Sequence, residues 1–250
     1  MKLILCSEGF HTPNTIEACV KLVGKPKDQI SIGIINEAYA VEEGDKRWVL
    51  DNLNSVANNF SGEIDIVDLL ALTIEDVEKR LADKDVIFVV GGDTDYLMSV
   101  YQKTGFDKLL PKLLETKVYV GSSAGSMVAG KRISAAAYRL IYGEDSKWNI
   151  NDYVGLVDLS VMPHLDSPHF PNRKESLLEA VGSFEGTVYG LRDDSAVVID
   201  GEEINTIGSK PIVIEKGQLL DWIRALVRWA CIRQYSYMKL FEIRRQCGTK

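Results

Sequence analysis

Short runs of apolar residues alternate along the chain with segments whose apolar positions recur every three or four residues. The runs have the length of buried strands, and the periodic segments are typical of amphipathic helices. The predicted strands are 3–6, 30–35, 64–69, 85–90 and 117–120, and the predicted helical segments are 15–23, 45–60, 96–114 and one that starts at Thr73. Because such alternation requires crossover connections, the pattern predicts a three-layer α/β fold, with a mainly parallel sheet and helices on both faces.

The pattern becomes richer in strands after residue 157. Further apolar runs cover 159–162, 187–191, 196–199 and 211–214, and short turns such as Asp200-Gly201 separate the later ones. This predicts antiparallel additions at the edge of the sheet. We expect residues 1–216 to form one α/β domain.

The last part of the chain, residues 217–250, has a different composition. Residues 221–250 contain seven Lys and Arg against two acidic residues, and their spacing predicts a basic helical tail. Three interpretations remain open for this tail. It is a helix docked on the core or on a second subunit, a basic surface helix for a membrane or an acidic partner, or an extension that is not native to the domain.

Composition narrows the class of protein. The 250 residues are 46 % hydrophobic and 26 % charged, as in ordinary globular proteins. A net charge of −7 argues against a nucleic-acid-binding surface spread over the molecule. The four cysteines form no CxxC pair, which argues against a zinc site and favours a reducing compartment. Because no apolar run has the length of a signal-peptide core or a membrane span, we expect a cytoplasmic protein without membrane contact.

The segment most informative about chemistry is Gly121-Ser122-Ser123-Ala124-Gly125-Ser126. An apolar strand runs into Gly-x-Ser-x-Gly and an apolar helix follows, which is the context of a nucleophile elbow. Such a turn presents the Ser123 hydroxyl at the carboxyl end of the sheet. The helix that follows directs free N–H groups toward developing negative charge. We therefore predict that Ser123 is a nucleophile.

A serine nucleophile needs a base, and the chain has only three histidines. His164 directly follows the predicted strand 159–162 and is preferred to His169. A metal site made by these two histidines is disfavoured, because they lack helical spacing and no cysteine is near. The acid that orients the imidazole is expected in the turn near residue 143, from Glu144 or Asp145.

A second glycine-rich turn, Gly91-Gly92-Asp93-Thr94-Asp95, also joins a strand to a helix. It has neither of the two common phosphate-binding patterns, GxGxxG and GxxxxGK[ST]. An oxyanion hole is the better interpretation, with the amides of Gly92 and Ala124 as the two donors. Asp93 or Thr94 would cap the following helix.

Together these motifs resemble the peptidase E family of serine dipeptidases, the α-aspartyl dipeptidases, to which cyanophycinases are related. Gly91-Gly92-Asp93-Thr94 is similar to the Gly-Gly-Asn-Thr turn of that family, and 121–126 is similar to its G-x-S-A-G-[AS] elbow. Met162-Pro163-His164 resembles its Pro-His block, and 190–196 resembles its late strand-and-turn segment. The resemblance covers roughly residues 1–216.

The resemblance implies a fold similar to class I glutamine amidotransferase domains and a Ser–His–acid site that cleaves dipeptides after an N-terminal aspartate. Peptidase E members have an aspartate where this chain has Tyr138, which directs the search for the acid to Glu144 or Asp145, as in cyanophycinases. An aspartate-selective pocket needs a cation, and Arg173 is the preferred candidate, ahead of Lys174 and Arg139. Asp93 and Thr94 complete the predicted substrate-binding residues.

The leading hypothesis is a serine peptidase that acts on small acidic peptides, as a monomer or homodimer, without metal or organic cofactor. An α/β-hydrolase esterase shares the elbow, but His164 lies only 41 residues after Ser123, which is early for that fold. A glutamine amidotransferase would need a cysteine at position 123. A non-catalytic binding protein of the same fold is the remaining alternative.

Overall fold

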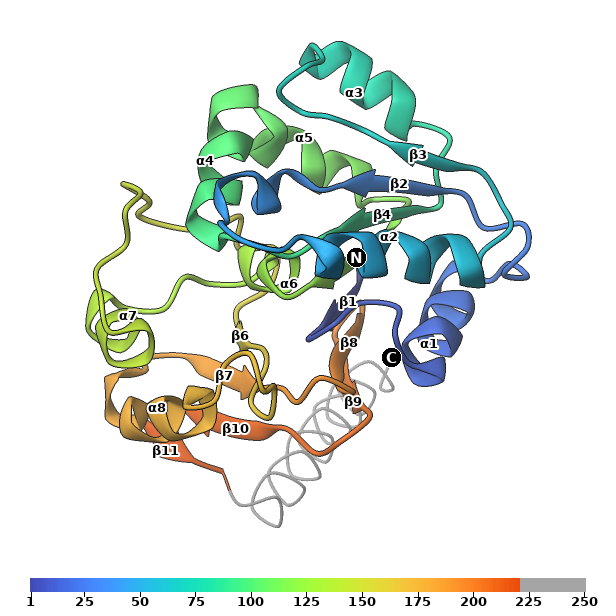
Figure 1. Ribbon diagram of the computed structural model, residues 1–250. Coiled ribbons are helices and arrows are strands. Elements are labelled where there is room, and N and C mark those ends of the chain that lie inside the picture. The colour runs from blue at the N-terminus through green and yellow to red at the C-terminus, as the bar shows by residue number, and fades with distance from the viewer. Residues whose placement is uncertain (221–250) are drawn as a thin grey trace, which may run out of the picture.

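The computed structural model describes residues 1–220, in which a seven-stranded sheet forms the centre of the molecule (Figure 1). Across the sheet the strands are β3 (Ile64–Ile66), β2 (Ile32–Ile35), β4 (Val86–Val89), β5 (Val118–Ser122), β1 (Lys2–Cys6), β8 (Ala196–Asp200) and β9 (Glu203–Ile207). From β3 to β1 all neighbours are parallel, whereas β8 and β9 are antiparallel additions at one edge. The predicted mainly parallel sheet with antiparallel edge strands is confirmed.

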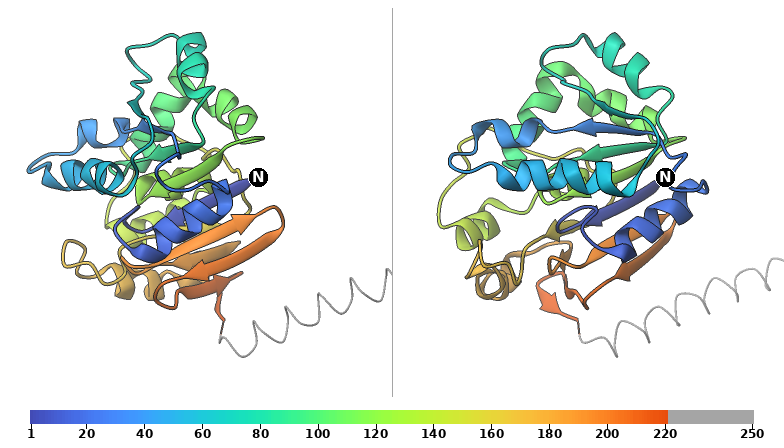
Figure 2. Two further views of the ribbon diagram at one scale, coloured as in Figure 1. Left: turned by 90° about the vertical axis from the view of Figure 1, so that its right-hand side faces the viewer. Right: turned by 45° about the vertical axis from the view of Figure 1, so that its right-hand side comes forward.

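Helices cover both faces of this sheet, as the two turned views show (Figure 2). Their bounds are α1 (Pro13–Val23), η1 (Glu37–Val41), α2 (Arg47–Asn59), α3 (Ile74–Leu81), α4 (Thr94–Thr104), α5 (Phe106–Leu113), α6 (Ala124–Ala129), α7 (Ala135–Tyr142), α8 (Arg173–Glu179) and η2 (Val181–Ser183). The side chains of β1 alternate between two cores. Leu3 and Leu5 belong to the core shared with α3 to α6, while Ile4 and Cys6 belong to the core shared with α1 and α2. The predicted three-layer architecture is therefore confirmed.

A second, smaller sheet was not predicted. It contains β11 (Gln218–Leu219), β10 (Ile212–Glu215), β7 (Thr187–Gly190) and β6 (Ser160–Met162), in that order. It lies beside the β8–β9 edge of the main sheet, with α8 against it (Figure 1). Its strands β6 and β7 are parallel, and the others pair antiparallel. This sheet matters for function because β6 ends two residues before His164, and β7 leads into the loop that contains Asp193.

Two of the predicted element boundaries differ from the structure. The single helix expected over 96–114 is two helices, because Gly105 has φ 80 and ends α4 in the left-handed conformation that glycine adopts readily. The predicted tail of residues 217–250 begins with β11, which pairs with β10, and residues 221–250 lie outside the described residues. Among the described residues, no helix combines the length and the apolar character needed to cross a bilayer.

Candidate active site

The Ser123 hydroxyl lies at a tight turn between β5 and α6. Ser123 has φ 51 and ψ −113, a conformation that residues with a Cβ rarely adopt. Glycines on both sides allow the chain to close. A Cβ on Gly121 would lie 2.5 Å from the amide nitrogen of Ser126, and one on Gly125 would lie 2.2 Å from the oxygen of Val89. The turn therefore has the geometry of a nucleophile elbow.

The structure brings His164 to this serine. His164 begins the loop after β6, and its Nε2 lies 2.9 Å from Ser123 Oγ. The backbone of His164 also has a positive φ, 66°. Its ring stacks on the ring of Phe170, with centroids 4.9 Å apart. His169, the less favoured candidate, is exposed to solvent.

The other ring nitrogen of His164 contacts an aspartate that the sequence reasoning did not select. Asp193, in the loop between β7 and β8, has Oδ1 2.7 Å from His164 Nδ1. The amide of Asp193 donates to Asp166 Oδ1 at 3.1 Å, which fixes the loop. Ser123, His164 and Asp193 are thus hydrogen-bonded in series, the arrangement in which an acid orients an imidazole against a serine.

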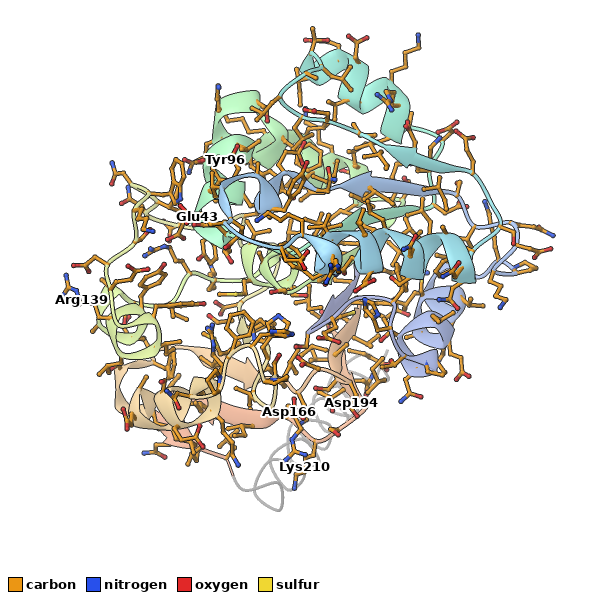
Figure 3. The ribbon with its side chains drawn as sticks, in the orientation of Figure 1. Glu43, Tyr96, Arg139, Asp166, Asp194 and Lys210 are labelled. Atoms are coloured by element: carbon orange, nitrogen blue, oxygen red, sulfur yellow. The ribbon has the colours of Figure 1, made fainter. Side chains whose placement is uncertain are left out.

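The two acids predicted for this place lie elsewhere. Asp145 is exposed and forms an ion pair with Arg139 of α7, and among the described residues neither Glu144 nor Asp145 bonds to His164. Figure 3 places Arg139 at the outer side of α7, well away from the loop that contains Asp166. The prediction looked for the acid between the serine and the histidine in the chain, whereas the topology brings in the loop that precedes β8.

The electrostatics of the site favour an ionised Asp193. Burial raises the pKa of this carboxyl, but the hydrogen bond and charge of His164 and hydrogen bonds from Ser7 and Ser167 outweigh burial, so the pKa lies below its ordinary value. Glu8 lies close by. Burial, and then the negative charge of Asp193, raise the pKa of the Glu8 carboxyl.

Glu8, His164 and Asp193 also form the group that could hold a metal ion among the described residues. One potential ligand atom of each lies within 4.8 Å of the others. A metal ion there would compete for His164 Nδ1, which already contacts Asp193 at 2.7 Å. Binding an ion would therefore break the series of hydrogen bonds described above.

The Gly91-Gly92 turn abuts the serine. A Cβ on Gly91 would lie 3.0 Å from Ser123 Cβ, and Gly92 has φ 136, with Ala38 so close that a side chain could not fit. Within the described part of the chain, the amides of Gly92 and Ala124 donate to no acceptor. Two free donors thus flank the serine, as an oxyanion hole requires.

The cation predicted for substrate binding lies next to the histidine. Arg173, at the start of α8, is half-buried, with its guanidinium 4.6 Å from the ring centroid of Tyr142 and 4.7 Å from that of Phe170. Phe170 in turn stacks on His164. Among the described residues Arg173 has no carboxylate within ion-pair distance. Its charge is available to an acidic ligand.

Asp93 and Thr94 occupy structural positions beside the site. Asp93 caps α4, because its Oδ1 accepts from the Tyr96 amide at 2.8 Å, and its Oδ2 accepts from Trp148 Nε1 at 3.2 Å. Thr94 Oγ1 lies 3.5 Å from Met127 Sδ. The prediction that one of these residues caps the following helix is confirmed for Asp93.

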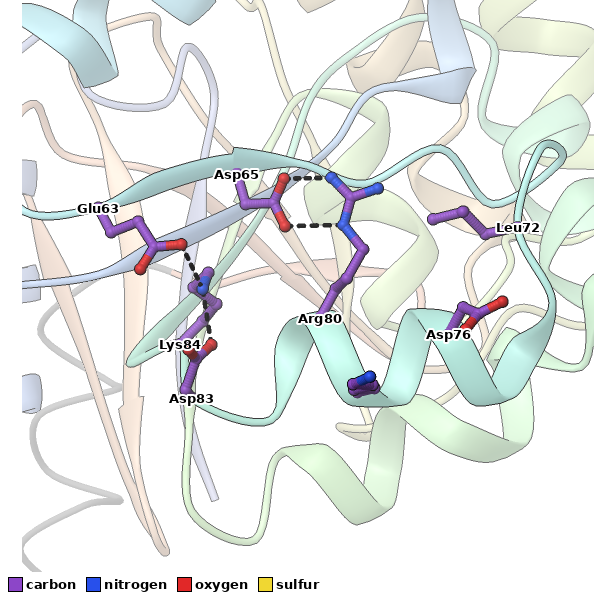
Figure 4. Close-up of a pocket in the computed structure, with 8 residues that line it drawn as sticks. Glu63, Asp65, Leu72, Asp76, Arg80, Asp83 and Lys84 are labelled. Atoms are coloured by element: carbon purple, nitrogen blue, oxygen red, sulfur yellow. Dashed lines mark hydrogen bonds and ion pairs between the residues drawn. The ribbon is translucent and has the colours of Figure 1, made fainter.

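A shallow pocket lies away from these residues. It has a volume of about 380 Å³ and is lined by α3 and by residues near the starts of β3 and β4 (Figure 4). Five of its charged side chains are paired with one another, since Arg80 bonds to Asp65, and Lys84 bonds to Glu63 and Asp83. Ser123 follows the carboxyl end of β5, at the opposite end of the parallel strands. The pocket is separate from the candidate active site.

A serine, a histidine and an aspartate in series at the carboxyl ends of a mainly parallel sheet define a serine hydrolase of the α/β class. The model of peptidase family S51 matches residues 26–207, and the chain belongs to this family. It is accordingly a serine-type peptidase, and the sequence-based resemblance to peptidase E is confirmed.

Individual relatives support the same family assignment. An uncharacterized peptidase of Listeria monocytogenes is 28 % identical over 148 residues, which cover 57 % of this chain and 70 % of the relative. Peptidase E of Streptomyces coelicolor is 28 % identical over 130 residues, which cover 49 % of this chain and 52 % of the relative.

Crystal structures show the same fold. A Listeria monocytogenes protein assigned to peptidase E superposes with a TM-score of 0.66 at 23 % identity, covering 84 % of this chain and 98 % of that chain. A peptidase from an acI-B1 Actinobacterium superposes with a TM-score of 0.60 at 20 % identity, covering 88 % and 93 %. The class I glutamine amidotransferase-like fold implied by the resemblance is consistent with these matches.

Proposed function

We propose that the chain hydrolyses small peptides with Ser123 as nucleophile, His164 as general base and Asp193 as the acid that orients the imidazole. The observation that carries the proposal is the unbroken series from Ser123 Oγ to His164 Nε2, at 2.9 Å, and from Nδ1 to Asp193 Oδ1, at 2.7 Å. Each separation is a normal hydrogen-bond distance for proton transfer or orientation.

The mechanism follows from these contacts. Ser123 Oγ attacks the scissile carbonyl carbon while His164 Nε2 takes its proton. Negative charge develops on the carbonyl oxygen, and the free amides of Gly92 and Ala124 stabilise it. His164 then gives the proton to the leaving amine as the C–N bond breaks. In the second half of the reaction His164 takes a proton from water, whose oxygen attacks the acyl carbon, and returns that proton to Ser123 Oγ as the ester bond breaks. Asp193 stabilises the imidazolium throughout without itself being protonated.

Substrate specificity for an N-terminal aspartate is supported by Arg173. Its guanidinium lies between two aromatic rings beside His164 and has no carboxylate partner among the described residues, so a substrate carboxylate can supply one. Thr94, which follows Asp93 at the start of α4, contacts Met127 Sδ. The hydroxyl of Tyr142, the residue beneath Arg173, contacts the same sulfur. We therefore infer that dipeptides with N-terminal aspartate are the preferred substrates.

The test is hydrolysis of Asp-p-nitroanilide, Leu-p-nitroanilide and p-nitrophenyl acetate by wild type, Ser123→Ala and His164→Ala. The proposal expects selective Asp turnover that both substitutions reduce by about 10³-fold or more. Arg173→Met is expected to lower kcat/KM for the Asp substrate about tenfold or more and to spare the ester, since only the former has a carboxylate. Turnover of the ester alone would indicate a general hydrolase. No turnover, together with a Ser123 that resists fluorophosphonate, would favour the non-catalytic alternative.

A further inference from the structure

Ser7, the residue directly after β1, contacts every member of the Ser123–His164–Asp193 series. We propose that Ser7 is the positioning residue that holds these three groups in register, a role that rests on the function proposed above. No motif in the sequence marks this serine. Its role becomes apparent only from the hydrogen bonds that its side chain and its backbone make.

The hydroxyl of Ser7 joins the histidine to the aspartate. It accepts a hydrogen bond from the backbone amide of His164 at 2.9 Å and donates one to Asp193 Oδ1 at 2.9 Å. His164 Nδ1 lies 3.3 Å from the same hydroxyl but only 2.7 Å from Asp193 Oδ1. The shorter contact directs the Nδ1 proton to the carboxylate, and the hydroxyl fixes both ends of that hydrogen bond.

The backbone of Ser7 holds the remaining member. Its carbonyl oxygen accepts from the amide of Ser123 at 3.0 Å, and its own amide donates to the oxygen of Ser195 at 3.1 Å. Ser123 and His164 both have positive φ, at 51° and 66°. The amide of each of these strained residues therefore donates to Ser7, which helps to hold conformations that an L-residue otherwise avoids.

A serine is the side chain that this place requires. Ser7 is fully buried, so water cannot replace a missing hydroxyl, and the group must accept one hydrogen bond while it donates another. Alanine would leave the His164 amide and one lone pair of Asp193 without their partner. Loss of the Ser7 hydroxyl would therefore disturb the geometry of the Ser123–His164–Asp193 series as well as lower the stability of the fold.

The experiment compares Ser7→Ala with Ser160→Ala, a matched control. Ser160 is also buried and donates to one backbone oxygen, that of Lys131 at 2.8 Å, away from the series. The proposal expects Ser7→Ala to lower kcat and the rate of fluorophosphonate labelling about ten- to a hundredfold, because small misplacements of reacting groups are costly, while KM changes less than about twofold. Ser160→Ala is expected to retain both rates at a similar melting temperature. Ser7→Thr, which keeps a hydroxyl, should recover part of the rate.

Proton NMR supplies a readout that does not depend on turnover. The Nδ1 proton between His164 and Asp193 resonates far downfield and is assigned by its loss in Asp193→Asn. It should move upfield or broaden in Ser7→Ala and stay in place in Ser160→Ala. Labelling of Ser7→Ala at the wild-type rate would overturn the proposal. If wild type itself resists fluorophosphonate, the proposed function fails, and an unmoved resonance in Ser7→Ala would then overturn the role of Ser7 separately.

Discussion

At the scale of single residues, two side chains that face each other across the site stand on backbone conformations that cost free energy. Ser123 and His164 both have positive φ, and such conformations cost about 1–3 kcal/mol each. The strain places Ser123 Oγ and His164 Nε2 2.9 Å apart. The orientation of the Ser123 and His164 side chains therefore depends on the groups that hold them. Asp193 is the group whose substitution tests this most directly.

Replacing Asp193 by asparagine should affect catalysis far more than stability. In Asp193→Asn the side chain no longer enforces the Nδ1–H tautomer of His164 or stabilises its cation, so kcat is expected to fall by about 10³- to 10⁴-fold. Asp145→Asn is the matched control. It removes only a surface ion pair with Arg139, worth about 1 kcal/mol or less, and should leave kcat within about twofold. Equal losses of kcat in the two variants would contradict the assignment of Asp193.

The sequence was sufficient for part of the site and not for the rest. Ser123 and His164 were selected because a glycine-flanked turn and a strand end restrict where a nucleophile and its base can lie. Asp193 was not selected, since an acid in an Asp-rich turn has no local pattern that separates it from solvated neighbours such as Asp194. The resemblance over 190–196 was the one available signal. Ser7 could not be found at all, because its role depends on contacts from 116 to 188 residues away.

At the scale of elements, the η1 segment joins the second strand to the glycine-rich turn of the site. The oxygen of Ala38 accepts from the Asp93 amide at 3.0 Å, and the buried carboxylate of Glu37 accepts from the Leu69 amide through Oε1. Among the described residues Glu37 Oε2 has no partner. Burial is the main reason that the pKa of Glu37 rises to about 7, against the opposing effect of backbone hydrogen bonds.

This carboxyl should make the fold less stable as pH rises. The pKa of Glu37 is about 7 in the fold and about 4.3 in the unfolded chain, so ionisation begins to favour unfolding above pH 4.3, and the penalty is complete above pH 7. The difference corresponds to roughly 4 kcal/mol. Urea unfolding of Glu37→Gln, which keeps an acceptor for Leu69, should show a stability gain over wild type that grows between pH 4 and pH 7. Glu43→Gln, at an exposed position labelled in Figure 3, should keep the wild-type pH dependence. A constant difference between wild type and Glu37→Gln at all pH values would contradict the assignment.

Helices and strands could be predicted from the sequence where their burial produces a regular pattern of apolar residues. The inner strands β1, β2, β4 and β5 appear as largely continuous apolar runs because both faces are covered, whereas the edge strand β3 alternates apolar and polar residues. The strand β9 escaped prediction, since it is an edge strand with mostly exposed side chains, and apolar runs do not mark such strands. The second sheet was not predicted for a different reason. Its strands β6, β7 and β10 were predicted and β11 was not, and nothing local indicates that these strands pair with one another rather than with the main sheet.

At the scale of the whole molecule, the first strand lies inside the main sheet and not at its edge. The family match begins at residue 26, yet β1 lies between β5 and β8 and pairs with both along its full length. Its residues Leu3, Ile4 and Leu5 are completely buried. The order of strands in space therefore differs from their order in the chain, and β1 pairs with β8, a strand from the last quarter of the chain.

A chain that starts at residue 26 is expected not to fold, although it contains every residue of the family match. It would lack β1 and α1, leaving β5 and β8 without the strand that joins them. Circular dichroism on heating should show no cooperative transition in this truncated chain, whereas the full chain melts cooperatively. A cooperative melt of the truncated chain would mean that β5 and β8 can pair without β1.

The placement of β1 has a consequence for the time at which a newly made chain becomes able to cleave peptides. β1 is synthesised before both of its partner strands, one of which begins at residue 118 and the other at residue 196. Of the proposed series, Ser123 emerges from the ribosome before His164, and Asp193 emerges last. The nascent polypeptide therefore has no oriented base until nearly all of the described chain has been synthesised. From the synthesis of residue 123 until that of residue 193, the polypeptide contains the proposed nucleophile without the complete pair of base and acid that would activate it.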